Sequence, residues 1–97
     1  MNMENLGKFY INGAWIAPKS SLAMPVLNPA TELQIGSVAL GSAADVDTAV
    51  AAANLAFVSY SQTSKADRLV LLHRLMAVTQ SRFEDLAQAM SMEMGAP

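Results

Sequence analysis

The first forty residues alternate short apolar runs with turn residues, as β-strands do. Two aromatic and β-branched runs flank Asn12 and Gly13. Asn-Gly tolerates the positive φ that both central residues of a type I′ turn need, so this pair predicts a β-hairpin. Turn chemistry and alternation predict a second pair, with strands at 26–27 and 33–40. The pattern therefore predicts two antiparallel strand pairs within residues 8–40.

The second half of the chain follows a helical repeat. Ser42 and Ser64 are each followed three residues later by an aspartate, the acidic form of a capping box at a helix N-terminus. Apolar residues at helical spacing then predict an alanine-rich helix over 42–58 and a longer helix over 64–94, with a bend allowed near 80–81. The predicted fold class of the segment is α+β, with two strand pairs followed by a two-helix hairpin of unequal arms.

Composition changes this picture by indicating that the segment has more apolar surface than it can bury. Of 97 residues, 53% are apolar and only 14% are charged, and a chain this short buries only about two thirds of its unfolded surface. We therefore expect part of the apolar surface to meet another surface. The net charge of −2 predicts no nucleic-acid partner. The longest uncharged run is too polar to span a bilayer and the first residues contain no secretory signal, so we predict a cytoplasmic protein with no membrane partner.

Candidate chemistry is sparse. The absence of cysteine excludes disulfides, thiolate metal sites and a cysteine nucleophile. His73 lies at the flank of the long helix's apolar stripe, and no carboxylate shares its face at helical spacing. Glu84 and Asp85 are neighbours and point in different directions on a helix. The glycines form no GxGxxG turn. Residue chemistry alone thus predicts no catalytic and no cofactor-binding residue here.

Four motifs nevertheless occur in the order and spacing of a known family. They are "FYINGAW", the "NPAT" turn, the helix start "ADVDTAV" and the ending "EMGAP". From about Phe9 to Pro97 the chain resembles the N-terminal segment of the NAD(P)-dependent aldehyde dehydrogenase superfamily. The resemblance implies the outer part of the coenzyme-binding domain of an α/β parent enzyme, whose Rossmann-like sheet follows after Pro97.

The resemblance also implies a parent activity that this segment does not carry. In the family a cysteine thiolate attacks the aldehyde, hydride passes to NAD or NADP, and a glutamate-activated water hydrolyses the thioester to a carboxylic acid. Those residues belong to motifs that have no match in this chain. The segment alone is therefore expected to be inactive. Its expected partner is the remainder of the enzyme chain, and the parent is expected to be a homo-oligomer.

One family feature does reach into the segment. Several members hold a monovalent cation, K⁺ or Na⁺, through backbone carbonyls before the "NP" turn and an acidic side chain before the closing glycine. The matching positions are Val26 and Leu27 for the carbonyls and Glu93 for the carboxylate. A cation would also relieve the anion that Glu93 places at a helix C-terminus, where the macrodipole disfavours it.

Two alternatives from other classes stay open. The chain could be a complete small α+β interaction module that binds a partner helix through its helical apolar face. It could also be a truncated chain that regulates an intact homologous subunit by docking on it.

Overall fold

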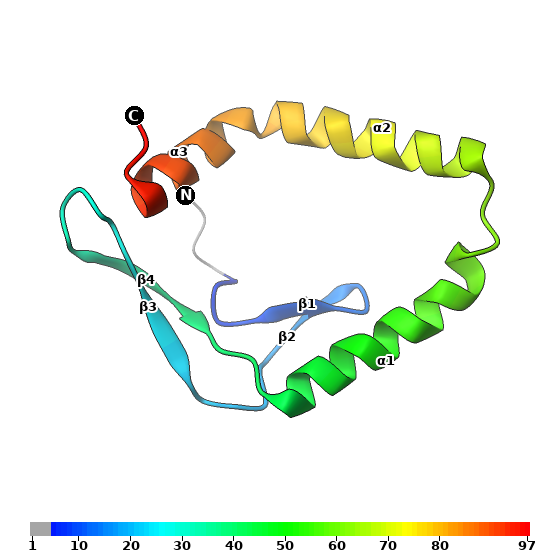
Figure 1. Ribbon diagram of the computed structural model, residues 1–97, viewed down its shortest axis with the longest axis horizontal. Helices are drawn as coiled ribbons and strands as arrows, with labels where there is room; N and C mark the ends of the chain where they lie inside the picture. The colour runs from blue at the N-terminus through cyan, green and yellow to red at the C-terminus, as the bar shows by residue number, and fades with distance from the viewer. Residues whose placement is uncertain (1–4) are drawn as a thin grey trace.

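The computed structural model describes residues 5–97, which form two β-hairpins followed by three helices (Figure 1). The strands pair β1 with β2 and β3 with β4, both antiparallel, which confirms the predicted α+β class and its two strand pairs. The elements are β1 Phe9–Ile11, β2 Ala14–Ile16, β3 Ala23–Leu27, β4 Gln34–Ala39, α1 Ala43–Tyr60, α2 Lys65–Ser81 and α3 Phe83–Met94.

The first hairpin turns at the predicted dipeptide. Asn12 and Gly13 have φ values of 53° and 77°, the positive angles of a type I′ turn. On one face of the hairpin, Tyr10 and Trp15 pack edge to face with ring centroids 5.2 Å apart. Phe9 packs against Gly41, where an added Cβ would lie 3.7 Å from the ring. The hairpin thereby lies against the chain that enters α1.

The second hairpin has a longer turn than the sequence indicated. Asn28 closes it, because its backbone N–H donates to the Leu33 carbonyl at 2.9 Å and its side-chain oxygen accepts from the Ala30 amide at 2.9 Å. The ladder shifts register between Val26 and Leu27. Strand β4 accordingly begins one residue later than the predicted strand at 33–40.

Both predicted capping boxes form. Ser42 accepts from the Asp45 amide while Asp45 accepts from the Ser42 amide, and Ser64 and Asp67 make the same reciprocal pair. These side chains satisfy N–H groups that have no partner within the helix. Helices α1 and α2 therefore begin directly after the two serines.

The long second helical arm is divided into two helices at Arg82. This residue has φ −111° and ψ 20°, outside the helical region, so α2 ends and α3 begins around it. The break lies next to the bend allowed at 80–81. Helices α1 and α2 also diverge from their connecting turn instead of lying along each other as a hairpin would (Figure 1). Among the described elements, α2 packs mainly against α3, which follows it in the chain, and not against α1.

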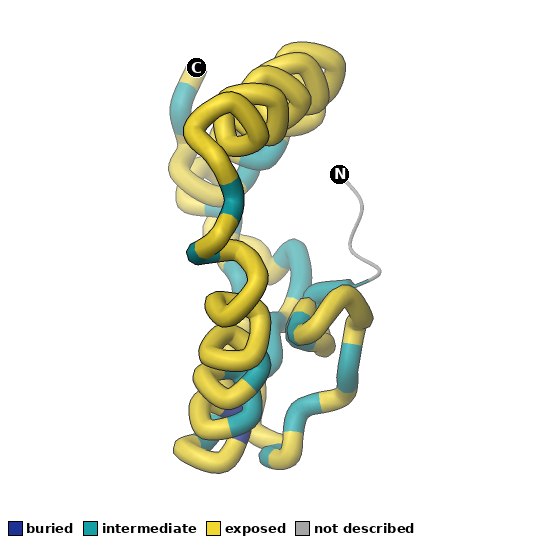
Figure 2. The backbone as a smooth tube through the Cα atoms, turned by 90° about the vertical axis from the view of Figure 1, so that its right-hand side faces the viewer, coloured by how far each residue is buried: buried dark blue, intermediate teal, exposed yellow. Residues whose placement is uncertain are grey.

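The described residues enclose no hydrophobic core. Asp45, 4% exposed, is the one buried residue among them, and no apolar side chain is buried (Figure 2). The radius of gyration is 16.9 Å, against about 12.5 Å for a compact domain of this length. The accessible surface is 7648 Å², against about 5,400 Å² for a folded monomer of this mass. The chain is an open arc with roughly 2,200 Å² of excess surface.

The helices were also compared with the requirements of a membrane span. None of those in residues 5–97 combines the length and the hydropathy that crossing a bilayer requires.

Asp45 ties the β2–β3 connection to α1. Besides closing its capping box, the carboxylate accepts from the Lys19 amide at 2.9 Å, and the Lys19 ammonium donates to Thr48 Oγ1 at 2.8 Å. Hydrogen bonds from the Ser42 and Lys19 amides stabilise the charged carboxylate and lower the pKa of Asp45 below 3.8. Asp45 therefore does more than cap a helix.

Replacing Asp45→Asn is expected to reduce helix content in α1 at neutral pH more than Asp67→Asn does in α2, because Asp67 makes only its local box. Since the folded pKa of Asp45 is depressed, its stabilisation is complete above 3.8 and disappears as pH falls through the lower folded value. NMR titration of the Asp45 carboxyl carbon, with amide shifts of α1, measures both effects. An ordinary aspartate pKa at Asp45 would contradict the prediction.

Candidate functional site

The structure places the three predicted cation ligands at one end of the molecule. Val26, half-buried, and Leu27, exposed, end β3, while Glu93 is exposed in the last turn of α3. The end of α3 lies against the turn after β3, since a Cβ added at Gly95 would be 3.7 Å from the Pro29 ring. Figure 1 shows the same approach of α3 to the second hairpin.

The three predicted ligands would each donate an oxygen. Backbone carbonyls and one carboxylate are hard ligands of the kind that alkali cations accept, and they differ from the nitrogen and sulfur sets that hold zinc. Residues 5–97 contain no group of three His, Cys, Asp or Glu side chains that could hold a metal ion. The last turn of α3 also carries no basic residue. The donor set fits a monovalent cation better than a transition metal.

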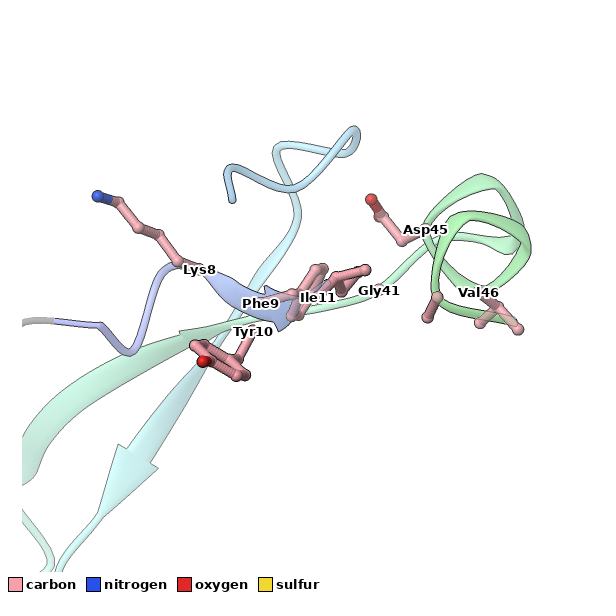
Figure 3. Close-up of a pocket in the computed structure, with 8 residues that line it drawn as sticks. Lys8, Phe9, Tyr10, Ile11, Gly41, Asp45 and Val46 are labelled. Atoms are coloured by element: carbon pink, nitrogen blue, oxygen red, sulfur yellow. The ribbon is translucent and has the colours of Figure 1, made fainter. Parts of the chain in front are cut away.

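An apolar trough lies between β1 and α1 (Figure 3). It has a volume of about 410 Å³ and is lined by Lys8, Phe9, Tyr10, Ile11, Gly41, Asp45, Val46 and Ala49. The Lys8 ammonium points away from the other lining residues (Figure 3), and the Asp45 carboxylate is occupied by Ser42 and Lys19. The trough therefore offers packing surface instead of reactive groups.

The helix N-termini do not fit the phosphates of a dinucleotide. A helix N-terminus attracts a phosphate through its first amides and its dipole, but the first turns of α1 and α2 carry the carboxylates of Asp45 and Asp67, which disfavour a second anion. The first turn of α3 carries Glu84 and Asp85, which repel an anion. The three helix N-termini therefore carry charge of the wrong sign for a phosphate.

The remaining titratable candidates form local surface contacts. His73 is exposed on α2. Glu84 accepts from the Gln88 side chain at 3.1 Å, and Asp85 forms an exposed ion pair with Arg82 at 3.3 Å. Exposed pairs of this kind contribute little stability and belong to a solvated helix surface.

Sequence reasoning missed the polar tie at the corner between α1 and α2. Arg68 reaches back so that Nε donates to Thr63 Oγ1 at 2.9 Å, and its guanidinium lies 5.3 Å from the centre of the Tyr60 ring. It also donates to the carbonyls of Tyr60 and Ser61. Helix α1 has no basic residue in its last turn, so Arg68 supplies the cation that stabilises a helix C-terminus. The absence of a basic residue from the last turn of α1 is the sequence feature that could have predicted a cation supplied from α2.

Comparison with solved structures finds this arc inside much larger enzymes. It superposes with a TM-score of 0.95 and 49% identity on a mutant of aldehyde dehydrogenase C from Pseudomonas syringae, crystallised with NAD⁺ and octanal. An aldehyde dehydrogenase from Bartonella henselae gives a TM-score of 0.91 and 40% identity. The matches cover 98% and 93% of this chain, but 20% and 19% of those enzymes.

Sequence comparison agrees. A 3-succinoylsemialdehyde-pyridine dehydrogenase from a Pseudomonas species is 43% identical over 95 residues, covering 98% of this chain and 20% of the relative. The chain thus spans about a fifth of the length of the curated relatives it matches. The sequence model described as "Aldehyde dehydrogenase family" matches residues 15–97. The chain belongs to the aldehyde dehydrogenase family.

Proposed function

We propose that this chain is the N-terminal part of the coenzyme-binding domain of an NAD-dependent aldehyde dehydrogenase, a cytoplasmic homo-oligomer that oxidises an aldehyde to a carboxylic acid. The observation that carries the proposal is the open arc without a buried apolar side chain, in the conformation found in an enzyme five times longer. The catalytic cysteine and the coenzyme turn of that enzyme have no counterpart in the 97 residues. Within the whole enzyme, this part is a packing layer.

The experiment is to incubate the chain alone with NAD⁺ and octanal and to follow NADH. We expect no NADH, because the chain has no cysteine and the first turn of each described helix carries a carboxylate that disfavours a pyrophosphate. The intact Pseudomonas syringae enzyme serves as the positive control. Formation of NADH by the chain alone would refute its assignment as an inactive part of the enzyme.

The second part of the proposal concerns the cation. Val26 and Leu27 would supply carbonyl oxygens and Glu93 a carboxylate to K⁺ or Na⁺. Support comes from the contact between Gly95 and Pro29, which brings the end of α3 to the end of β3, and from the all-oxygen donor set. A cation at this point would join the second hairpin to α3 and offset the unfavourable anion at the helix C-terminus.

Glu93→Gln is expected to weaken K⁺ binding by about tenfold or more, or about 1.4 kcal/mol, since it removes the one charged ligand of the proposed site. The measurement is the rise of melting temperature with K⁺ concentration in the enzyme reassembled from this chain and the remaining four fifths. Glu84→Gln, an exposed glutamate in the first turn of the same helix, is the matched control. A K⁺ dependence unchanged by Glu93→Gln would exclude Glu93 as a ligand.

A further inference from the structure

The turn of the first hairpin joins two residues that can react with each other. The backbone nitrogen of a glycine can attack the side-chain carbonyl carbon of a preceding asparagine, because glycine has no Cβ to hinder the close approach. Asparagine occurs at five positions of the chain, and Asn12 is the one followed by glycine. Asn12 and Gly13 are therefore a candidate site of covalent modification.

Within residues 5–97, nothing holds the two reacting groups in place. Neither the Gly13 N–H nor the Asn12 side chain makes a hydrogen bond there, and a Cβ added at Gly13 would meet no atom within 4 Å. Asn12 also borders a hollow of about 260 Å³. The opposite side of this hollow consists of alanines of α1, whose side chains have no polar group: Ala49, Ala52, Ala53 and Ala56.

The hairpin is also short enough to open. Strands β1 and β2 contain three residues each, and a two-stranded hairpin is marginally stable by itself. Local opening of such a segment requires little free energy. It releases Asn12 from its φ of 53°, so that the side chain can turn its carbonyl carbon toward the Gly13 nitrogen.

The other asparagines between residues 5 and 97 have unsuitable neighbours. Asn28 precedes a proline, which has no N–H proton to lose. Asn5 and Asn54 precede leucine, whose side chain hinders the attack. Asn54 also lies inside α1, where the following amide donates to the helix's own carbonyl ladder. The chemistry therefore selects Asn12.

We propose that Asn12 deamidates spontaneously and that one product opens the first hairpin. The Gly13 nitrogen forms a bond to Asn12 Cγ, the bond from Cγ to the side-chain nitrogen breaks, and ammonia leaves with the proton of the Gly13 amide. Water then opens the five-membered imide at either carbonyl, which gives aspartate or isoaspartate. The reaction requires only two adjacent residues and water, so it is independent of the proposed function.

The two products differ in their effect on the hairpin. Isoaspartate routes the backbone through its Cβ and lengthens the turn by one carbon atom, which breaks the pairing of Ile11 with Ala14 and separates Tyr10 from Trp15, whose rings are 5.2 Å apart. Aspartate leaves the backbone unchanged, and Asp-Gly is also a favoured type I′ dipeptide. The isoaspartyl form alone should therefore lose the hairpin.

Peptide mapping by mass spectrometry tests the reaction on the 97-residue chain incubated in mildly alkaline buffer. Asn12 should deamidate at least about tenfold faster than Asn54, yield both products, and react faster as pH rises, because the attacking nitrogen must lose its proton. Gly13→Leu gives Asn12 the same neighbour as Asn54 and should slow its reaction at least about tenfold. Equal rates at the two asparagines of the unaltered chain, or aspartate without isoaspartate, would overturn the proposal.

The structural effect is tested by comparing the purified isoaspartyl chain with the Asn12→Asp variant. The two have the same mass and the same charge and differ only in the path of the backbone. NMR cross-peaks between the Tyr10 ring and the indole of Trp15, the chain's single tryptophan, should be present in Asn12→Asp and absent from the isoaspartyl chain. Equal cross-peaks in the two chains would contradict the opening of the hairpin.

Discussion

Supplying this chain with the missing four fifths of a related enzyme is expected to produce NAD-dependent aldehyde oxidation that neither piece shows alone. The chain contributes the hairpins and helices, and the partner piece contributes the residues that the family uses for chemistry. The Pseudomonas syringae enzyme, in its unmutated form and shortened by its matching fifth, is a suitable partner because the two arcs superpose with a TM-score of 0.95. NADH formation in the mixture should exceed that of either piece by at least about 1,000-fold, since enzymatic accelerations are far larger than this.

Two substitutions of Leu72 test whether the gain in activity requires α2 to pack against the partner piece. Leu72 is an exposed apolar residue of α2. Leu72→Glu places a charge on the face that the rest of the enzyme would cover, and it should abolish the gain in activity, because a buried unpaired charge is strongly destabilising. Leu72→Met conserves volume and should cost less than about 1.5 kcal/mol. Full activity with Leu72→Glu would contradict the coverage of α2 by the rest of the enzyme.

The features that could be predicted from the sequence are those that neighbouring residues determine. Asn12 and Gly13 form their turn, and Ser42 and Ser64 cap their helices, because each motif satisfies its own backbone within three or four residues. The predicted resemblance to the aldehyde dehydrogenase family is also confirmed, since it rests on short motifs and not on packing. The cation ligands Val26, Leu27 and Glu93 remain a prediction.

The features that could not be predicted depend on contacts distant in the chain. The break at Arg82 has no proline or glycine to mark it. The tie between Asp45 and the Lys19 amide uses a backbone donor, which every residue other than proline possesses. A helical hairpin was expected because α1 and α2 each have an apolar face, but their connecting turn directs them apart. The apolar faces therefore stay exposed among residues 5–97.

The second large effect concerns folding. In dilute solution the chain alone should unfold without a cooperative transition, because cooperativity comes from a shared core and no apolar side chain among residues 5–97 is buried. Local turns and capped helices would melt gradually and separately.

Differential scanning calorimetry of the dilute chain tests most directly whether these residues are part of a larger fold. A self-sufficient domain of this length would absorb about 70 kcal/mol at its midpoint. We predict far less heat and no peak for the chain alone, and a cooperative peak once the remaining four fifths of the enzyme is added. A sharp, concentration-independent peak of about 70 kcal/mol from the chain alone would contradict the proposal and show that the arc folds as an independent domain.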